Sequence, residues 1–241
     1  MKSLVKALKK RTTAVFFDLE GTGTSHEIVE IGAIKATLKP DGTIKKVFKP
    51  FHYYVMPKAK MGSYVSSLTG LTDRFLEENG IPFRVMQKSL TKYVGKDYKN
   101  AVYFCYGDQD PHMFIYSAEN NMDASMEEAK FVAHHCFNFL SFFSRYVTGD
   151  DGNPINLTKA CDLFGVKPTG KAHTALADAY GLMNLYSAFL EKTDLVASEY
   201  RKTLFRGRGL PEPFRIVLAR LQKGESIDLA TFDNILKESL E

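Results

Sequence analysis

The chain of 241 residues is long enough to bury a full core, as one large domain or as a domain with an appendage. Its net charge of +4, from 32 Lys and Arg against 28 Asp and Glu, excludes a polybasic nucleic-acid coat, although a clustered basic excess suits an acidic partner. The three cysteines lack metal-site spacing and predict reduced thiols in a cytoplasmic protein, and no segment has the apolar length of a signal peptide or a membrane span.

The first predicted element is a buried strand that ends in two carboxylates. Residues 14–17 are a short apolar block, and a glycine-rich turn follows at 21–23. Asp18 and Glu20 lie two residues apart, so a strand projects both to the same side. Holding two carboxylates close together costs Coulomb and desolvation energy, and a divalent cation shared between them would offset that cost. Alternatively, the two carboxylates are simply solvated at the end of a strand.

An antiparallel meander is predicted from this strand and the next two. Residues 27–36 and 43–55 have strand character, and the Pro-Asp-Gly turn at 40–42 between them suits a hairpin. Short connections of this kind join neighbouring antiparallel strands.

Two helices and a second buried strand follow in the middle of the chain. Asp73 would be the N-cap of a short helix that ends near Asn79-Gly80, and Pro82 would open an amphipathic helix. Residues 101–106 are apolar throughout, which predicts a strand buried on both faces.

A further carboxylate follows that second buried strand. Pro111 is favourable at the first position of a helix, which makes Asp110 the cap or the residue just before it. Asp110 therefore lies at the carboxyl end of a strand, where open α/β sheets usually bind ligands.

The last informative segment joins a histidine to a fourth carboxylate. Helices are predicted over 124–147 and 157–164, and another begins at His173 or Thr174. Asp178 falls one turn into that helix, and His173 lies in the approach to it, so the two side chains can converge on one point.

These motifs, in this order, resemble the DEDDh exonucleases, which include ribonuclease T, the proofreading epsilon subunit of bacterial DNA polymerase and Eri-type exoribonucleases. The resemblance covers about residues 15–190 and rests on Phe17-Asp18-Leu19-Glu20-x-Thr22-Gly23, Leu68-Thr69-Gly70-Leu71-Thr72, Gly107-Asp108-Gln109-Asp110 and His173-x-Ala175-x-x-Asp178-Ala179. The third phrase is closest to the Eri-type enzymes. This motif contains two candidates for the third carboxylate, Asp108 and Asp110. The position of Asp110 at the start of the predicted helix favours Asp110.

The resemblance implies a metal-dependent 3′-5′ exonuclease that releases nucleoside 5′-monophosphates from the 3′ ends of single-stranded RNA or DNA. Two Mg²⁺ or Mn²⁺ ions would be held by four carboxylates, Asp18, Glu20, Asp110 and Asp178. His173 would be the general base. The backbone around Leu19, Gly21 and Thr22 would bind the terminal nucleotide, although Gly21 replaces the threonine of many relatives.

The same resemblance implies a ribonuclease H-like α/β fold over residues 1–193, with a mixed five-stranded sheet flanked by helices. Two other functions remain open. The stretch Phe17-Asp18-Leu19-Glu20-Gly21-Thr22 also resembles the first motif of haloacid-dehalogenase-like phosphatases, although the second acid of that motif is usually aspartate. A catalytically silent nucleic-acid-binding or scaffold protein is the other alternative.

Residues 194–241 lie outside the resemblance, and their sequence predicts a helical extension. Its basic residues, including Arg201, Arg206 and Arg208, alternate with aromatic ones, a pattern that suits phosphate and base contacts. A solvated helical face explains the pattern equally well, and the tail is also a candidate surface for a protein partner. The stretch Ser226-Ile227-Asp228 is predicted to cap a final helix that runs to Leu240.

Overall fold

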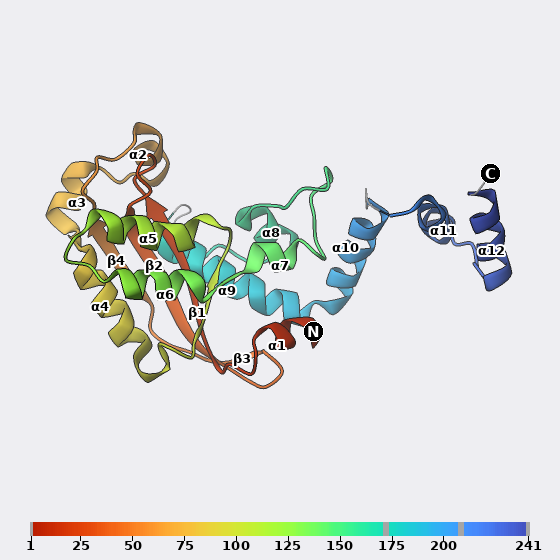
Figure 1. Ribbon diagram of the computed structural model, residues 1–241, viewed down its shortest axis with the longest axis horizontal. Helices are drawn as coiled ribbons and strands as arrows, with labels where there is room; N and C mark the ends of the chain where they lie inside the picture. The colour runs from red at the N-terminus through yellow and green to blue at the C-terminus, as the bar shows by residue number, and fades with distance from the viewer. Residues whose placement is uncertain (1, 171–173, 207–209, 240–241) are drawn as a thin grey trace. The chain divides into compact units, whose positions relative to one another are not determined.

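The computed structural model describes residues 2–170, 174–206 and 210–239 (Figure 1). The chain forms two compact units: Met1–Phe142 with Asn156–Thr193, and Phe143–Ile155 with Asp194–Glu241. Within the described residues, no helix combines the length and apolarity needed to cross a membrane.

The first unit contains a mixed sheet of seven strands in the order β5-β4-β2-β1-β6-β7, with β3 paired to β2. The strands are β1 (Thr13–Gly21), β2 (Ile28–Leu38), β3 (Ile44–Val47), β4 (Phe51–Met56), β5 (Ile81–Pro82), β6 (Val102–Cys105) and β7 (Cys136–Asn138). The central strand β1 is antiparallel to β2 and parallel to β6. This arrangement confirms the mixed sheet and the antiparallel meander.

Seven strands form where five were predicted, partly because the segment 43–55 divides into β3 and β4. Pro50 lies between them, and proline has no N–H to donate to a strand ladder. The short strand β5, beside β4, ends at Pro82, immediately before the helix predicted to begin there.

The predicted helix over 124–147 is wrong. Helix α6 (Met126–His134) ends at the His135 cap, β7 follows, and α7 (Phe139–Phe143) is a separate short helix. Strand β7 pairs in parallel with β6, with Cys136 opposite Tyr103. Pairing at the sheet edge thus overrides a helical spacing of aromatic residues.

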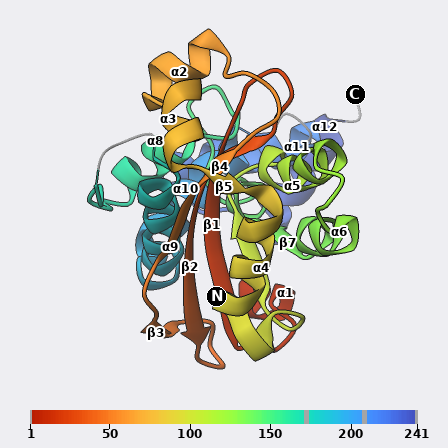
Figure 2. The same ribbon diagram turned by 90° about the vertical axis from the view of Figure 1, so that its left-hand side faces the viewer.

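Helices cover both faces of the sheet, as Figure 2 shows with α9 on one side and α4, α5 and α6 on the other. The remaining helices up to residue 191 are α1 (Lys2–Ala7), α2 (Ser63–Thr69), α3 (Asp73–Asn79), α4 (Phe83–Val94), the 3-10 turn η1 (Gly95–Asp97), α5 (Gln109–Asn120), α8 (Leu157–Leu163) and α9 (Ala175–Glu191). On the α9 face, the ring of Phe16 stacks on Phe104, 4.7 Å between centroids, and contacts Tyr186 of α9 at 5.1 Å. These buried rings fix α9 against the sheet.

Helix α3 begins one residue differently from the prediction. Its cap is Thr72, whose hydroxyl accepts the Phe75 N–H, and Asp73 is the first helical residue. The Asp73 carboxylate instead accepts the Met61 N–H at 2.8 Å.

The second unit is helical in its C-terminal part, as predicted. It contains α10 (Thr193–Phe205), α11 (Glu212–Gln222) and α12 (Leu229–Glu238). Asp228 caps α12, and the rings of Phe214 and Phe232 join α11 to α12 at 5.7 Å between centroids.

Candidate active site

The alternation of side chains along β1 separates the core from two carboxylates. Val15, Phe17 and Leu19 are buried in the core that α4, α5 and α6 share. Asp18 and Glu20 are partly exposed and project to the other side of the strand. Both lie near the carboxyl end of the central strand.

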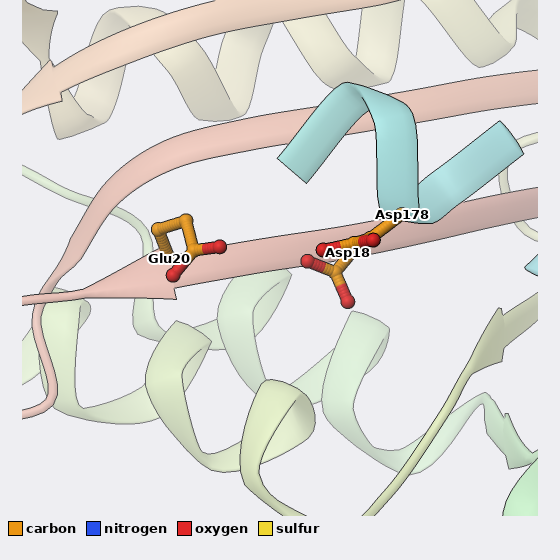
Figure 3. A group of neighbouring side chains, drawn as sticks. All are labelled: Asp18, Glu20 and Asp178. Carbon is orange, nitrogen blue, oxygen red and sulfur yellow. The ribbon is translucent and has the colours of Figure 1, made fainter. Parts of the chain in front are cut away.

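Helix α9 adds a third carboxylate to this side of the sheet. The Thr174 hydroxyl caps the helix by accepting the Ala177 N–H, which places Asp178 in its first turn. One carboxylate oxygen each from Asp18, Glu20 and Asp178 lie within 4.8 Å of one another. Figure 3 shows the two strand carboxylates and the helix carboxylate together, with Glu20 further along β1.

Asp110 approaches the same strand from α5. It is 8% exposed, and the backbone N–H of Leu19, the residue between Asp18 and Glu20, offsets part of the rise in its pKa that burial causes. Helix α5 begins at Gln109, two residues before Pro111, so Asp110 is inside the first turn rather than at the cap. Proline is tolerated there because N–H groups in the first turn have no partner within the helix.

Burial and like charges shift the pKa values of these acids upward. Burial raises the pKa of Asp18 well above its usual range, and the charges of Asp110 and Asp178 raise it further. Burial, followed by the charge of Glu30, raises the pKa of Glu20 to about 7. Burial also raises the pKa of Asp110. The folded chain therefore holds these carboxylates close together against their mutual repulsion.

Glu30 is a further acid that the sequence analysis missed. It is the cross-strand partner of Glu20 on β2, it is 1% exposed, and its Oε1 lies 2.7 Å from Nε2 of His52 on β4. Glu30 is the one charged residue in the apolar run of residues 28–34. A charged side chain is seldom buried unless it is paired, so this pattern indicates a specific partner. Its partner His52 lies in a different strand, which periodicity does not identify.

The predicted nucleotide-binding residues lie beside the acids in β1 and just after it, and the polar groups of Thr22 have partners in the protein. The Thr22 N–H donates to the Glu27 carbonyl, and the Thr22 hydroxyl lies 2.7 Å from the Ser25 hydroxyl. A Cβ built on Gly21 would lie 3.1 Å from the end of the Met113 side chain. The binding roles of Leu19, Gly21 and Thr22 stay predictions. His173, the predicted general base, lies outside the described residues.

The donor set fits divalent cations. Carboxylate oxygens are the ligands that Mg²⁺, Mn²⁺ and Ca²⁺ prefer. Among the described residues, no basic side chain forms an ion pair with Asp18 or Glu20. Concentrated negative charge without a basic partner is the arrangement that a bound cation stabilises.

A family model described as an exonuclease, RNase_T, matches residues 15–186. The chain belongs to this exonuclease family. The match spans the segment on which the sequence resemblance rests and confirms it, and it favours the exonuclease over the phosphatase-like alternative.

Solved structures of exonucleases share the fold. The nuclease domain of 3′hExo, a DEDDh family member bound to rAMP, has a TM-score of 0.62 and 16% identity over 76% of this chain and 94% of that chain. Exonuclease I of E. coli, in complex with an oligonucleotide, has a TM-score of 0.58 and 14% identity over 86% of this chain and 45% of that chain. A 3′-exonuclease in a structure of histone mRNA stem-loop recognition has a TM-score of 0.60 and 17% identity over 79% of this chain and 70% of that chain.

Among curated proteins, the chain is similar to the PolC-type DNA polymerase III of Caldanaerobacter subterraneus. The two are 26% identical over 221 residues, which is 87% of this chain. The chain spans only 14% of the length of that polymerase.

Proposed function

We propose that this chain is a metal-dependent 3′-5′ exonuclease that releases nucleoside 5′-monophosphates from the 3′ ends of single-stranded RNA or DNA. One observation carries the proposal: the RNase_T family match includes Asp18, Glu20 and Asp178, whose carboxylates lie within 4.8 Å of one another. The fold shared with 3′hExo and Exonuclease I supports it.

The four carboxylates have distinct supports in this proposal. Asp18 and Glu20 are fixed by the central strand, and Asp178 by the first turn of α9. Asp110 is buried in the first turn of α5. Together they would hold two Mg²⁺ or Mn²⁺ ions, which supply an activated water and stabilise the leaving 3′ oxygen.

His173 is proposed as the general base. It immediately precedes Thr174, the cap of α9, in the sequence, and Asp178 lies one turn further on. A neutral imidazole accepts the proton of an attacking water near neutral pH.

The proposed exonuclease domain comprises residues 1–193, and residues 194–241 are proposed as an extension that contacts the substrate or a protein partner. The structures of 3′hExo and Exonuclease I hold rAMP and an oligonucleotide, respectively. Those ligands motivate testing both RNA and DNA with this chain.

The test is a cleavage assay on matched single-stranded RNA and DNA, labelled at the 5′ end, with Mg²⁺, Mn²⁺ or EDTA. We expect stepwise shortening from the 3′ end, nucleoside 5′-monophosphate products and complete inhibition by EDTA. Asp178→Asn should abolish shortening, whereas Glu77→Gln, an exposed acid on α3, should not. Binding of single strands without shortening in any metal would instead identify a catalytically silent binding protein.

A further inference from the structure

Three exposed rings form a row on the first unit, which we call the ring row: His26, His112 and Tyr116. His112 and Tyr116 lie four residues apart on α5, and His26 lies in the loop between β1 and β2. The ring centroids of His26 and Tyr116 are 5.9 Å apart, and those of His112 and Tyr116 are 6.3 Å apart. The ring planes are tilted by 32° in the first pair and by 31° in the second, with Tyr116 common to both pairs.

The loop that carries His26 is held at both ends. At its start, the Thr22 N–H donates to the Glu27 carbonyl at 2.9 Å. At its end, the Ile28 N–H donates to the Ser117 hydroxyl of α5, also at 2.9 Å. His26 itself has φ of 52°, in the left-handed region that non-glycine residues seldom adopt. These contacts hold the backbone of the loop that carries His26, which lowers the ordering cost of a contact with a ligand.

The two segments that carry the ring row follow Asp18, Glu20 and Asp110 in the chain, whereas Asp178 lies on α9. His112 follows Asp110 by two residues on α5, and the His26 loop continues directly from Glu20 at the end of β1. Asp110 is buried, whereas the side chains of the ring row are exposed, Tyr116 by 39%. His112 and His26 are thus two and six residues after an acid along the chain, and a strand with its 3′ end at the acids would meet the ring row by following α5 and the His26 loop.

We propose that the ring row binds single-stranded nucleic acid by stacking on bases upstream of the 3′-terminal nucleotide. The inference rests on the proposed exonuclease function. Aromatic rings stack on every base, so this contact adds affinity without selecting sequence or sugar. It predicts that the enzyme prefers strands long enough to reach the row.

The first test compares KM for a dodecanucleotide with KM for a dinucleotide that has the same 3′ end. Tyr116→Ala should raise the ratio of the dodecanucleotide KM to the dinucleotide KM about fivefold or more, the effect of losing one stacked base. Tyr53→Ala is the matched control because Tyr53, on β4, is 38% exposed. It should leave the ratio at the wild-type value.

The second test uses the absence of tryptophan from the chain. Tyr116→Trp introduces one indole, whose emission a stacked base should quench when the dodecanucleotide is added with Ca²⁺ in place of Mg²⁺. The emission of the Tyr53→Trp control should not change.

The outcomes separate this inference from the proposed function. If the wild-type protein shortens the dodecanucleotide but Tyr116→Ala leaves the KM ratio unchanged, the ring row does not bind substrate and the exonuclease assignment stands. If the wild-type protein shortens no strand, the exonuclease assignment fails. In that case, quenching of the Tyr116→Trp emission would still support the ring row, and unchanged emission would overturn it.

Discussion

Gly32 of β2 lies directly against Leu176 of α9: a Cβ built on Gly32 would come within 2.3 Å of the Leu176 backbone nitrogen and Cα. Gly32 is also the cross-strand partner of Asp18. Because Asp178 follows Leu176 by two residues, this close approach of helix to strand sets how near the two aspartates lie. The acidic cluster thus depends on a position where only glycine fits.

The first prediction follows from that contact. Gly32→Ala should displace the first turn of α9, lower the free energy of unfolding by about 1–3 kcal/mol and reduce exonuclease activity about a hundredfold, because small displacements of catalytic groups are costly. Thermal unfolding and the cleavage assay measure the two effects. Gly181→Ala, on α9 itself, is the control. A Cβ built on Gly181 would lie 3.6 Å from Cys161 Sγ, the nearest atom outside the helix backbone, which is an ordinary contact distance. The control should retain activity, and equal behaviour of the two variants would show that the Gly32 contact does not position Asp178.

The second prediction concerns Asp18→Asn. Burial, and then the charges of the neighbouring acids, disfavour the ionised form of Asp18, and asparagine avoids this cost, so the metal-free variant should have a higher Tm than the wild-type protein near neutral pH. The same change removes a carboxylate ligand, so Mn²⁺ should raise its Tm less, and exonuclease activity should fall about a hundredfold or more. Differential scanning fluorimetry across a Mn²⁺ titration measures both shifts. A Mn²⁺-dependent rise equal to that of Glu77→Gln would exclude Asp18 as a ligand.

The third prediction is a pH dependence of stability without metal. In the folded protein the pKa of Glu20 is raised to about 7, against about 4.3 in an unfolded chain. The folded state therefore binds more protons between these values, and its stabilisation is complete below about pH 4 and lost as pH rises through about 7. Asp18 shifts in the same direction.

The free energy of unfolding of the metal-free protein should accordingly fall by on the order of 2 kcal/mol between about pH 5 and about pH 8. Saturating Mn²⁺ should reverse the loss at the higher pH because cations bind the deprotonated carboxylates. Denaturant unfolding at each pH, with and without Mn²⁺, measures the free energy of unfolding. A metal-free stability that rises over this range would show that the cluster is not held against its own repulsion.

Local sequence patterns predicted where Asp18, Glu20 and Asp178 lie within their own strand or helix. The period of two along β1 placed Asp18 and Glu20 on one side, and the capping sequence placed Asp178 in the first turn of α9. These features depend on neighbours in the sequence. The distance between the strand and the helix depends on Gly32, whose role only the three-dimensional contact reveals.

Patterns failed where long-range pairing decided the structure. The aromatic spacing of 124–147 indicated one helix, but pairing of Cys136 with Tyr103 adds a strand there. Likewise, the Glu30 and His52 pair joins β2 to β4 through side chains 22 positions apart. Neither contact has a periodic signature in one sequence.

The fourth prediction tests that pair. His52→Ala should leave the Glu30 carboxylate buried without its 2.7 Å partner and lower the free energy of unfolding by about 1–3 kcal/mol. His52→Gln retains a side-chain donor and should recover part of the loss. Thermal unfolding at one pH compares the two variants. Equal stability of both variants and the wild-type protein would show that the pair contributes nothing to the sheet.

The fifth prediction separates two arginines of the C-terminal unit. The Arg206 guanidinium donates to the Gly149 carbonyl at 3.0 Å and to the Asp150 carboxylate at 2.7 Å, so it is already engaged within the unit. Arg206→Ala should therefore release this loop and lower the free energy of unfolding by about 1–3 kcal/mol. Arg208 lies outside the described residues.

Arg201 is exposed on α10 and tests the proposed phosphate contacts. If the tail binds single strands, Arg201→Ala should keep the wild-type Tm, weaken binding of a single strand, and flatten the slope of log affinity against log salt by about 0.7, the value for one lost phosphate contact on a single strand. Fluorescence anisotropy over a salt series measures the slope, with Arg74→Ala on α3 as an exposed control. Loss of a phosphate contact reduces the number of counterions released on binding, so it must change the salt slope. An unchanged slope in Arg201→Ala would therefore show that Arg201 does not contact the nucleic acid and would favour a solvated helical face.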